Sequence, residues 1–300
     1  MAAVPAITVE DRAPSPGTGE RRFARVLLGN RKFVWGSAIF LAITLTAIIG
    51  GLGISDADRR TGAVPARQEP SSDWILGTTS LGQSVAVQWT EAVPNSLKIG
   101  LVAATIGTIV GAIVGLIAGY FGGKIDAALR VLIDVFLSVP SLLFLILIAS
   151  LARGVGVLDM ALIIGIFAWA WPARAVRAQA LSLKERPFVQ VAHLSGMSNV
   201  EIVGRELFPH LLTWLGANFL NAFISAILAE SGLSILGLGP QQEMTLGMMI
   251  YWSLSYSSIF LNLWWWWLTP VVTLMVLFLS LYLVHLGLDE VGNPRLRTQA

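Results

Sequence analysis

The chain of 300 residues contains no cysteine and few charged side chains. The absence of cysteine excludes disulfides, thiolate chemistry and cysteine-ligated metals, and it leaves the redox compartment open. Charged residues make up 13% of the sequence, and the formal net charge is only +2. Such a small net charge gives no reason to expect nucleic acid as a partner, so the distribution of charge along the chain matters more than its sum.

The sequence also lacks the motifs of an enzyme. A nucleotide-binding P-loop needs Gly-x-x-x-x-Gly-Lys-Ser/Thr, but Lys124 is followed by Ile125, and Ala118 stands where the first glycine belongs. There is no Gly-x-Ser-x-Gly nucleophile elbow. The histidines are scattered without metal-ligand spacing, at His193, His210 and His285. We therefore expect a non-catalytic chain that itself binds no ATP, no metal and no other cofactor.

Apolar sequence is abundant. Hydrophobic residues make up 55% of the chain, and the mean hydropathy is +0.72. These runs exceed what one globular core can use, which indicates an all-α integral membrane protein. The first run is too long for the apolar part of a cleavable signal, so we expect it to remain as a helix. Six runs are long enough to span a bilayer, at residues 34–53, 96–121, 127–152, 158–178, 211–235 and 261–286.

The charge distribution predicts the orientation of these spans. With the N-terminus in the cytoplasm, all but five of the 20 basic residues fall on the cytoplasmic side, the exceptions being Arg59, Arg60, Arg67, Lys98 and Arg153. This asymmetry predicts that both termini are cytoplasmic. The expected division is a cytoplasmic tail at 1–33, a first transmembrane helix at 34–54, an extracytoplasmic loop at 55–93, a core of five transmembrane helices at 94–288 that includes the cytoplasmic stretch 184–209, and a cytoplasmic tail at 289–300.

Two local features modify this simple pattern of spans. Pro140 lies inside the third span and predicts a kink there. The segment at 237–258, between the fifth and sixth spans, is only mildly apolar and too short to cross the membrane. We expect this segment to be re-entrant or to lie on the surface.

Small and polar residues inside the spans are candidates for packing or for a translocation path. Four glycines recur at every fourth residue, which predicts a packing seam, with a ridge along a path as the alternative: Gly107, Gly111, Gly115 and Gly119. Asp134 and Glu230 predict either hydrogen bonds to a neighbouring helix or a role in substrate passage. A polar stripe on the fifth span faces either a helix or a water-filled path, and it consists of Asn218, Asn221 and Ser225.

Two further stretches stand out. The tryptophans at 264–267 predict an anchor at the outer membrane interface, with a platform for sugar or peptide as the alternative. In the polar stretch at 184–209, Pro187 favours a helix start, Gly196 a helix stop and Ser198 with Glu201 a capping box. We therefore expect two short cytoplasmic helices that meet at an angle and form a docking surface. The first helix has an apolar or small face, made by Phe188, Val191, Ala192 and Ser195.

Several motifs occur together in a specific order. The stretch from Phe188 to Ala192, with Gly196 and Pro209, resembles a cytoplasmic loop of the pattern Glu-Ala-Ala, three residues, Gly and later Pro, although Gln190 replaces the glutamate. Further matches are Gly119–Gly123 with Asp126, Arg130, Asp134 and Pro140, then Trp171–Arg174 with Arg177, then Ala229–Gly239 and Leu288–Arg295. Together they resemble an ABC importer permease of the oligopeptide, dipeptide and nickel family, the C-type subunit, over nearly everything after residue 30.

The resemblance implies a type I importer permease fold in a bacterial or archaeal inner membrane, surrounded by lipid. It implies a heterodimer with a second homologous permease, two cytoplasmic ATP-binding subunits that hold ATP and Mg, and an extracytoplasmic binding protein. The solute would be an oligopeptide or dipeptide; oligosaccharides, nickel or another small solute, and ATP-independent secondary transport, are the alternatives. The implied ATPase-coupling loop contains Phe188, Gln190, Val191, Ala192, His193, Gly196, Glu201 and Pro209.

Overall fold

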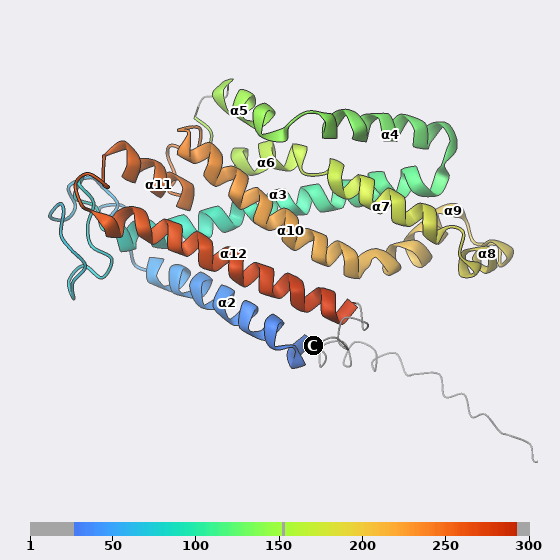
Figure 1. Cartoon of the computed structure of the whole chain (residues 1–300), viewed down its shortest axis with the longest axis horizontal. Coiled ribbons are helices and arrows are strands. Elements are labelled where there is room, and N and C mark those ends of the chain that lie inside the picture. The colour runs from blue at the N-terminus through green and yellow to red at the C-terminus, as the bar shows by residue number, and fades with distance from the viewer. Residues whose placement is uncertain (1–26, 152–153, 293–300) are drawn as a thin grey trace, which may run out of the picture.

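The computed structural model describes residues 27–151 and 154–292, which form a bundle of helices with one long loop (Figure 1). Most of each predicted tail therefore lies outside the described residues. The elements are α2 (Arg31–Gly51), α3 (Val85–Phe121), α4 (Gly123–Ser138), α5 (Ser141–Leu151), α6 (Val157–Phe167), α7 (Ala170–Leu183), α8 (Pro187–Leu194), α9 (Asn199–Glu201), the π-helical turn η1 (Ile202–Leu207), α10 (Phe208–Ile235), α11 (Leu246–Ser255) and α12 (Trp264–Gly292).

The six predicted spans correspond to four long helices and two bent pairs. Among the described residues, α2, α3, α12 and the run from α9 to α10 are long and apolar enough to cross a membrane. The pairs α4–α5 and α6–α7 meet the same criterion together, although they are bent by 76° and 40°. The break between α4 and α5 confirms the kink predicted at Pro140. Val139 is extended there because the proline ring disfavours a helical conformation in the preceding residue.

One predicted boundary was wrong. α3 begins at Val85, so residues 85–93 are helical and do not belong to the loop predicted at 55–93. Ser84 caps the first turn by accepting a hydrogen bond from the Val87 amide at 3.5 Å. Polar residues in these first turns lower the local hydropathy, which concealed the helix in the sequence. At the other end of the chain, α12 continues to Gly292, beyond the predicted start of the tail at residue 289.

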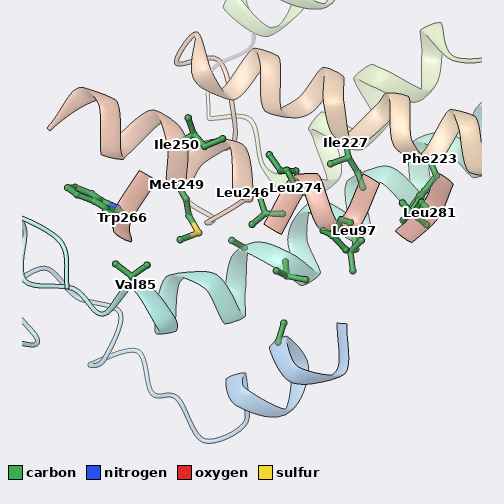
Figure 2. Close-up of a cluster of buried hydrophobic side chains, with 14 of the residues drawn as sticks. Val85, Leu97, Phe223, Ile227, Leu246, Met249, Ile250, Trp266, Leu274 and Leu281 are labelled. Carbon is green, nitrogen blue, oxygen red and sulfur yellow. The ribbon is translucent and has the colours of Figure 1, made fainter. Parts of the chain in front are cut away.

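α3 is the central helix and packs against α2, α6, α7 and α10. α2 and α12 lie together on one side of the bundle, and the two bent pairs lie on the other (Figure 1). The long loop and α11 occupy one end, whereas α8 and α9 occupy the opposite end (Figure 1). Figure 2 shows the main buried cluster, drawn from α3, α10, α11 and α12, with Val85, Leu97, Phe223, Ile227, Leu246, Met249, Ile250, Trp266, Leu274 and Leu281.

The end with the long loop is closed by α11 and the start of α12. α11 has ten residues, so it reaches about 15 Å and cannot cross a bilayer core of about 30 Å. This confirms that the segment at 237–258 is not a span. The prediction that all four tryptophans form an interface belt was wrong, because Trp265 and Trp266 are buried. Trp265 Nε1 donates a hydrogen bond to the Thr78 carbonyl at 3.1 Å, which fastens the long loop to α12.

Candidate functional site

Residues 184–209 fold as the predicted elbow of two short helices (Figure 1). α8 begins with Pro187 in its first turn. Gly196 follows with φ +80°, a left-handed conformation that glycine adopts without strain from a Cβ atom. The Ser198 amide donates to Glu201 Oε2 at 3.0 Å, and Ser198 Oγ accepts from the Glu201 amide at 3.3 Å. The predicted bend and capping box are therefore confirmed.

The second helix of the elbow continues into the fifth span. α9, η1 and α10 form one run from Asn199 to Ile235. Pro209 lies in the first turn of α10 and has no N–H to donate to the carbonyl four residues earlier. A π-helical turn is one adjustment that accommodates a proline within a span, and η1 provides it at residues 202–207. The second helix of the elbow is thus continuous with α10.

The elbow packs on the ends of α3 and α7 through its small apolar side chains. Val189 and Ala192 are buried, and they join Ile202 and Leu207 in one cluster with α3 and α7 residues. Of the predicted apolar or small face of α8, Ala192 packs on the bundle, whereas Val191 is 61% exposed. The side that contacts the bundle is the i, i+3 pair Val189 and Ala192.

Tyr120, at the end of α3, holds the two helices of the elbow together. Its hydroxyl donates to Asn199 Oδ1 at 2.9 Å and lies 3.3 Å from Nε2 of His193. The Tyr120 and His193 rings are stacked, with centroids 6.5 Å apart. The sequence identified Tyr120 only as part of a glycine-rich motif, and no local pattern links it to residues more than 70 positions away.

The outer surface of the elbow is apolar and accessible in this chain. Leu194 is 89% exposed and Val200 is 75% exposed, next to the exposed Gln190, Val191 and Gly196. Of the other predicted coupling residues, His193, Glu201 and Pro209 are exposed, whereas Phe188 is half-buried and stacks on His210 at 4.7 Å. Apolar side chains at the tip of a polar segment are suited to contact with another protein.

Two ion pairs join α7 to α4 near the elbow. Arg177 Nε and Nη2 donate to the two carboxylate oxygens of Asp126 at 2.5 and 2.6 Å. Arg174 donates to Asp134 at 2.6 Å, so the predicted hydrogen bond from Asp134 to a neighbouring helix is confirmed. All four residues belong to motifs that the sequence had singled out, and the fold brings those motifs together.

The four seam glycines of α3 lie against the α6–α7 pair. A Cβ atom on Gly107 would lie 2.7 Å from Ala168 Cβ, and one on Gly111 would lie 2.8 Å from the Trp169 carbonyl oxygen. The corresponding positions on Gly115 and Gly119 would meet the carbonyl oxygens of α7 at 2.6 and 2.7 Å. Their absent side chains allow the helix backbones to approach closely.

A cavity of about 670 Å³ lies where the two bent pairs face α10. Both helix breaks contribute to its wall, and so does the predicted polar stripe. Of the predicted path residues, Asn218, Asn221 and Ser225 therefore share one cavity. Of the aromatic residues in its wall, the sequence had identified only Trp171, as part of a motif. The lining residues are Phe136, Leu137, Val139, Pro140, Ser141, Leu145, Ile164, Phe167, Ala168, Trp171, Pro172, Asn218, Asn221, Ala222, Ser225, Ala226 and Ala229.

Glu230 does not line this cavity, which separates it from the other predicted path residues. It is fully buried where α10 meets the start of α11. Its carboxylate accepts hydrogen bonds from Thr245 Oγ1 at 2.6 Å and Ser234 Oγ at 2.7 Å. Glu230 therefore links α10 to the segment before α11. Within residues 27–151 and 154–292, no three acidic or histidine side chains come together as a metal site would require.

A bundle of membrane-spanning helices with a cavity between them and an exposed elbow joined to a cavity-lining helix fits a membrane transport subunit. The comparisons make the class specific. The family described as binding-protein-dependent transport system inner membrane component matches residues 111–298, and the chain belongs to this family of ABC importer permeases, in its peptide branch. The chain is thus a multi-pass inner membrane protein with the type I permease fold.

Relatives and a solved structure agree with this assignment. The chain is 30% identical to a protein of Brucella suis, provisionally named a peptide transport system permease protein, over 92% of both chains. It is 36% identical to the oligopeptide transport system permease protein OppC of Salmonella typhimurium, over 69% of this chain and 68% of that one. An inward facing structure of the MetNI methionine ABC transporter shares the fold, with TM-score 0.54, 20% identity, and coverage of 68% and 94%.

Proposed function

We propose that this permease imports oligopeptides or dipeptides that an extracytoplasmic binding protein delivers. It forms half of the translocation path, and a second homologous permease supplies the other half as a heterodimer. Two cytoplasmic ATP-binding subunits, which hold ATP and Mg, dock on the elbow at residues 184–209. The names of the peptide permeases similar to this chain support the choice of solute.

The observation that carries the mechanism is the continuity of the elbow with α10. The tip at Gly196 lies on one end of a unit whose other part, α10, lines the cavity with Asn218 and Asn221. Tyr120 and the buried Val189 keep the elbow from rotating freely on the bundle. Closure of the ATPases would then move α10 as a rigid body and open the cavity to one side of the membrane at a time.

The observed packing removes one reason for the oligosaccharide alternative. The four consecutive tryptophans suggested a platform for sugar or peptide as the alternative to an interface anchor, but Trp265 and Trp266 are buried and contact the protein itself. Oligosaccharide, nickel and ATP-independent transport therefore stand as outcomes of the test below, since no contact in the described residues favours them.

The test is uptake by proteoliposomes that contain this chain, its partner permease and the ATPases. We expect peptide uptake that requires the loaded binding protein outside and ATP with Mg inside. Deletion of residues 188–198 should abolish both ATPase association and uptake, whereas Gly216→Ala, on an exposed face of α10, should retain both. Uptake driven by an ion gradient without the ATPases, or uptake of sugar or nickel only, would refute the proposal.

A further inference from the structure

Asn218, in the wall of the cavity at the two helix breaks, has a hydrogen-bond donor that no described residue pairs with. The residue is only 4% exposed, and its side chain lines the cavity. Its Nδ2 atom is buried, and an unpaired buried amide group is unfavourable. A rotation of the amide about the Cβ–Cγ bond would present its N–H to a partner in the cavity.

The rest of the cavity wall defines what kind of partner fits. Asn221 and Ser225 present further polar groups from the same side of α10. Phe136, Phe167 and Trp171 form an apolar aromatic wall from the two bent pairs, and every described residue that lines the cavity is uncharged. The volume of about 670 Å³ lies within the range of about 300–1,000 Å³ that is typical of ligand sites.

We propose that this cavity binds the main chain of the transported peptide through the side-chain amides of Asn218 and Asn221, an inference that rests on the proposed function. An asparagine amide offers an N–H donor and a carbonyl acceptor, which are complementary to the C=O and N–H of a peptide group. Every residue of a peptide carries that group, so the contact does not depend on the peptide's sequence. The aromatic wall accepts apolar side chains of the bound segment.

Because the described wall carries no charge, we also expect the cavity to prefer uncharged peptide side chains to charged ones. A charged side chain held beside Asn218 would lose its hydration without gaining an ionic partner, which is strongly unfavourable. The site therefore takes the uncharged middle of a peptide and leaves charged termini outside the cavity. A central lysine or aspartate should weaken binding relative to a central alanine.

The test uses the full-length chain together with its partner permease in lipid nanodiscs and a photoreactive probe, acetyl-Ala-benzoylphenylalanine-Ala amide. After irradiation, mass spectrometry should locate the label within residues 136–141, 164–172 or 218–229. An excess of acetylated trialanine amide should compete with the label, and the analogue with a central lysine should compete at least fivefold more weakly. Labelling elsewhere, or competition by maltotriose and not by trialanine amide, would overturn the proposal.

Variants separate recognition by the amides from simple occupation of space. Asn218→Leu keeps the branched shape with the same number of side-chain heavy atoms and removes the hydrogen bond, so labelling should fall about fivefold to tenfold. Ala222→Trp fills the cavity and should abolish labelling. Thr213→Val removes an exposed polar group of α10 outside the cavity and should leave labelling unchanged. Equal labelling of Asn218→Leu and the wild type, with both eluting as the same species on size exclusion, would contradict the assignment.

This measurement is independent of ATP and of the binding protein. If labelling fails while ATP-driven peptide uptake succeeds, the site is wrong and the proposed function stands. If labelling succeeds while uptake requires no ATPase, the site stands and the coupling mechanism is wrong.

Discussion

Gly115 and Gly216 are both helical glycines, but their surroundings differ. A Cβ atom on Gly115 would lie 2.6 Å from the Ala173 carbonyl oxygen, whereas one on Gly216 would meet nothing within 4 Å. The same substitution should therefore have opposite effects at the two positions.

We expect Gly115→Ala to destabilise the protein by about 1–3 kcal/mol, because the added methyl forces α3 away from α7. The matched control, Gly216→Ala, should be neutral or stabilise by about 0.5–1 kcal/mol, since alanine is the better helix former. Thermal unfolding of the purified chain in detergent measures both. Equal melting temperatures for the two variants would show that α3 and α7 do not approach each other at this seam.

Thr245 gives a second prediction for a single side chain. It donates to Glu230 at 2.6 Å, and its Oγ1 also accepts from the Met248 amide at 3.1 Å as the N-cap of α11. Thr245→Val keeps the shape and removes both contacts, so we expect a loss of about 2–3 kcal/mol.

The control is Thr105→Val, because Thr105 is exposed and donates to the Leu101 carbonyl of its own helix. Hydrogen exchange should be faster over residues 243–256 in Thr245→Val and unchanged in Thr105→Val. Unchanged exchange in both variants would remove the proposed link between Glu230 and α11.

Residues differed in how well the sequence predicted their positions. Gly196, Ser198 and Glu201 act through local backbone chemistry, and the structure places them as expected. Glu230 depends on tertiary neighbours: a hydrogen bond to a neighbouring element was one of its two predicted roles, but its partner Thr245 lies on the segment that follows α10. No helical periodicity contains that information.

At the scale of elements, α4 and α7 are joined by two ion pairs between residues of the sequence motifs. The Asp126 and Arg177 side chains are each 19% exposed and form a bidentate pair, whereas Arg174 and Asp134 are 57% and 46% exposed. A more protected pair is less screened by solvent and should couple the helices more strongly.

A double-mutant cycle of Asp126→Asn and Arg177→Gln should give a coupling energy within about 0.5–3 kcal/mol. The corresponding cycle for Asp134→Asn and Arg174→Gln should give less, because exposed pairs contribute about 0–1 kcal/mol. Chemical or thermal unfolding in detergent supplies the four stabilities of each cycle. A larger coupling energy for the exposed pair would contradict this account of how α4 is held.

Element boundaries were predicted less well than element existence. The six apolar runs correspond to the four long helices and two bent pairs, because hydropathy reports long buried or lipid-facing segments. The start of α3 at Val85 was missed because its first turns are polar, and their burial against α11 and α12 is a tertiary effect. The 76° bend at Pro140 could be located from the sequence, but its size could not.

At the scale of the whole molecule, the elbow and the cavity are joined through α10. The elbow lies at the end of the bundle opposite the long loop and α11 (Figure 1). α10 continues from the elbow to the cavity wall, and the two helix breaks lie in the same wall. The positive charges of the sequence predict which end is cytoplasmic, and the fold places the elbow and the long loop at opposite ends as that orientation requires.

The central claim is that the elbow receives the ATPases, and cysteine cross-linking tests it most directly. The chain has no cysteine, so Leu194→Cys introduces its single thiol on the exposed tip of α8. In membranes that contain the assembled transporter, a short thiol cross-linker should join Leu194→Cys to an ATPase subunit. The control is Phe260→Cys, because Phe260 lies between α11 and α12 and is 92% exposed. This variant should give no cross-link to an ATPase. An ATPase cross-link at Phe260→Cys and none at Leu194→Cys would contradict the account.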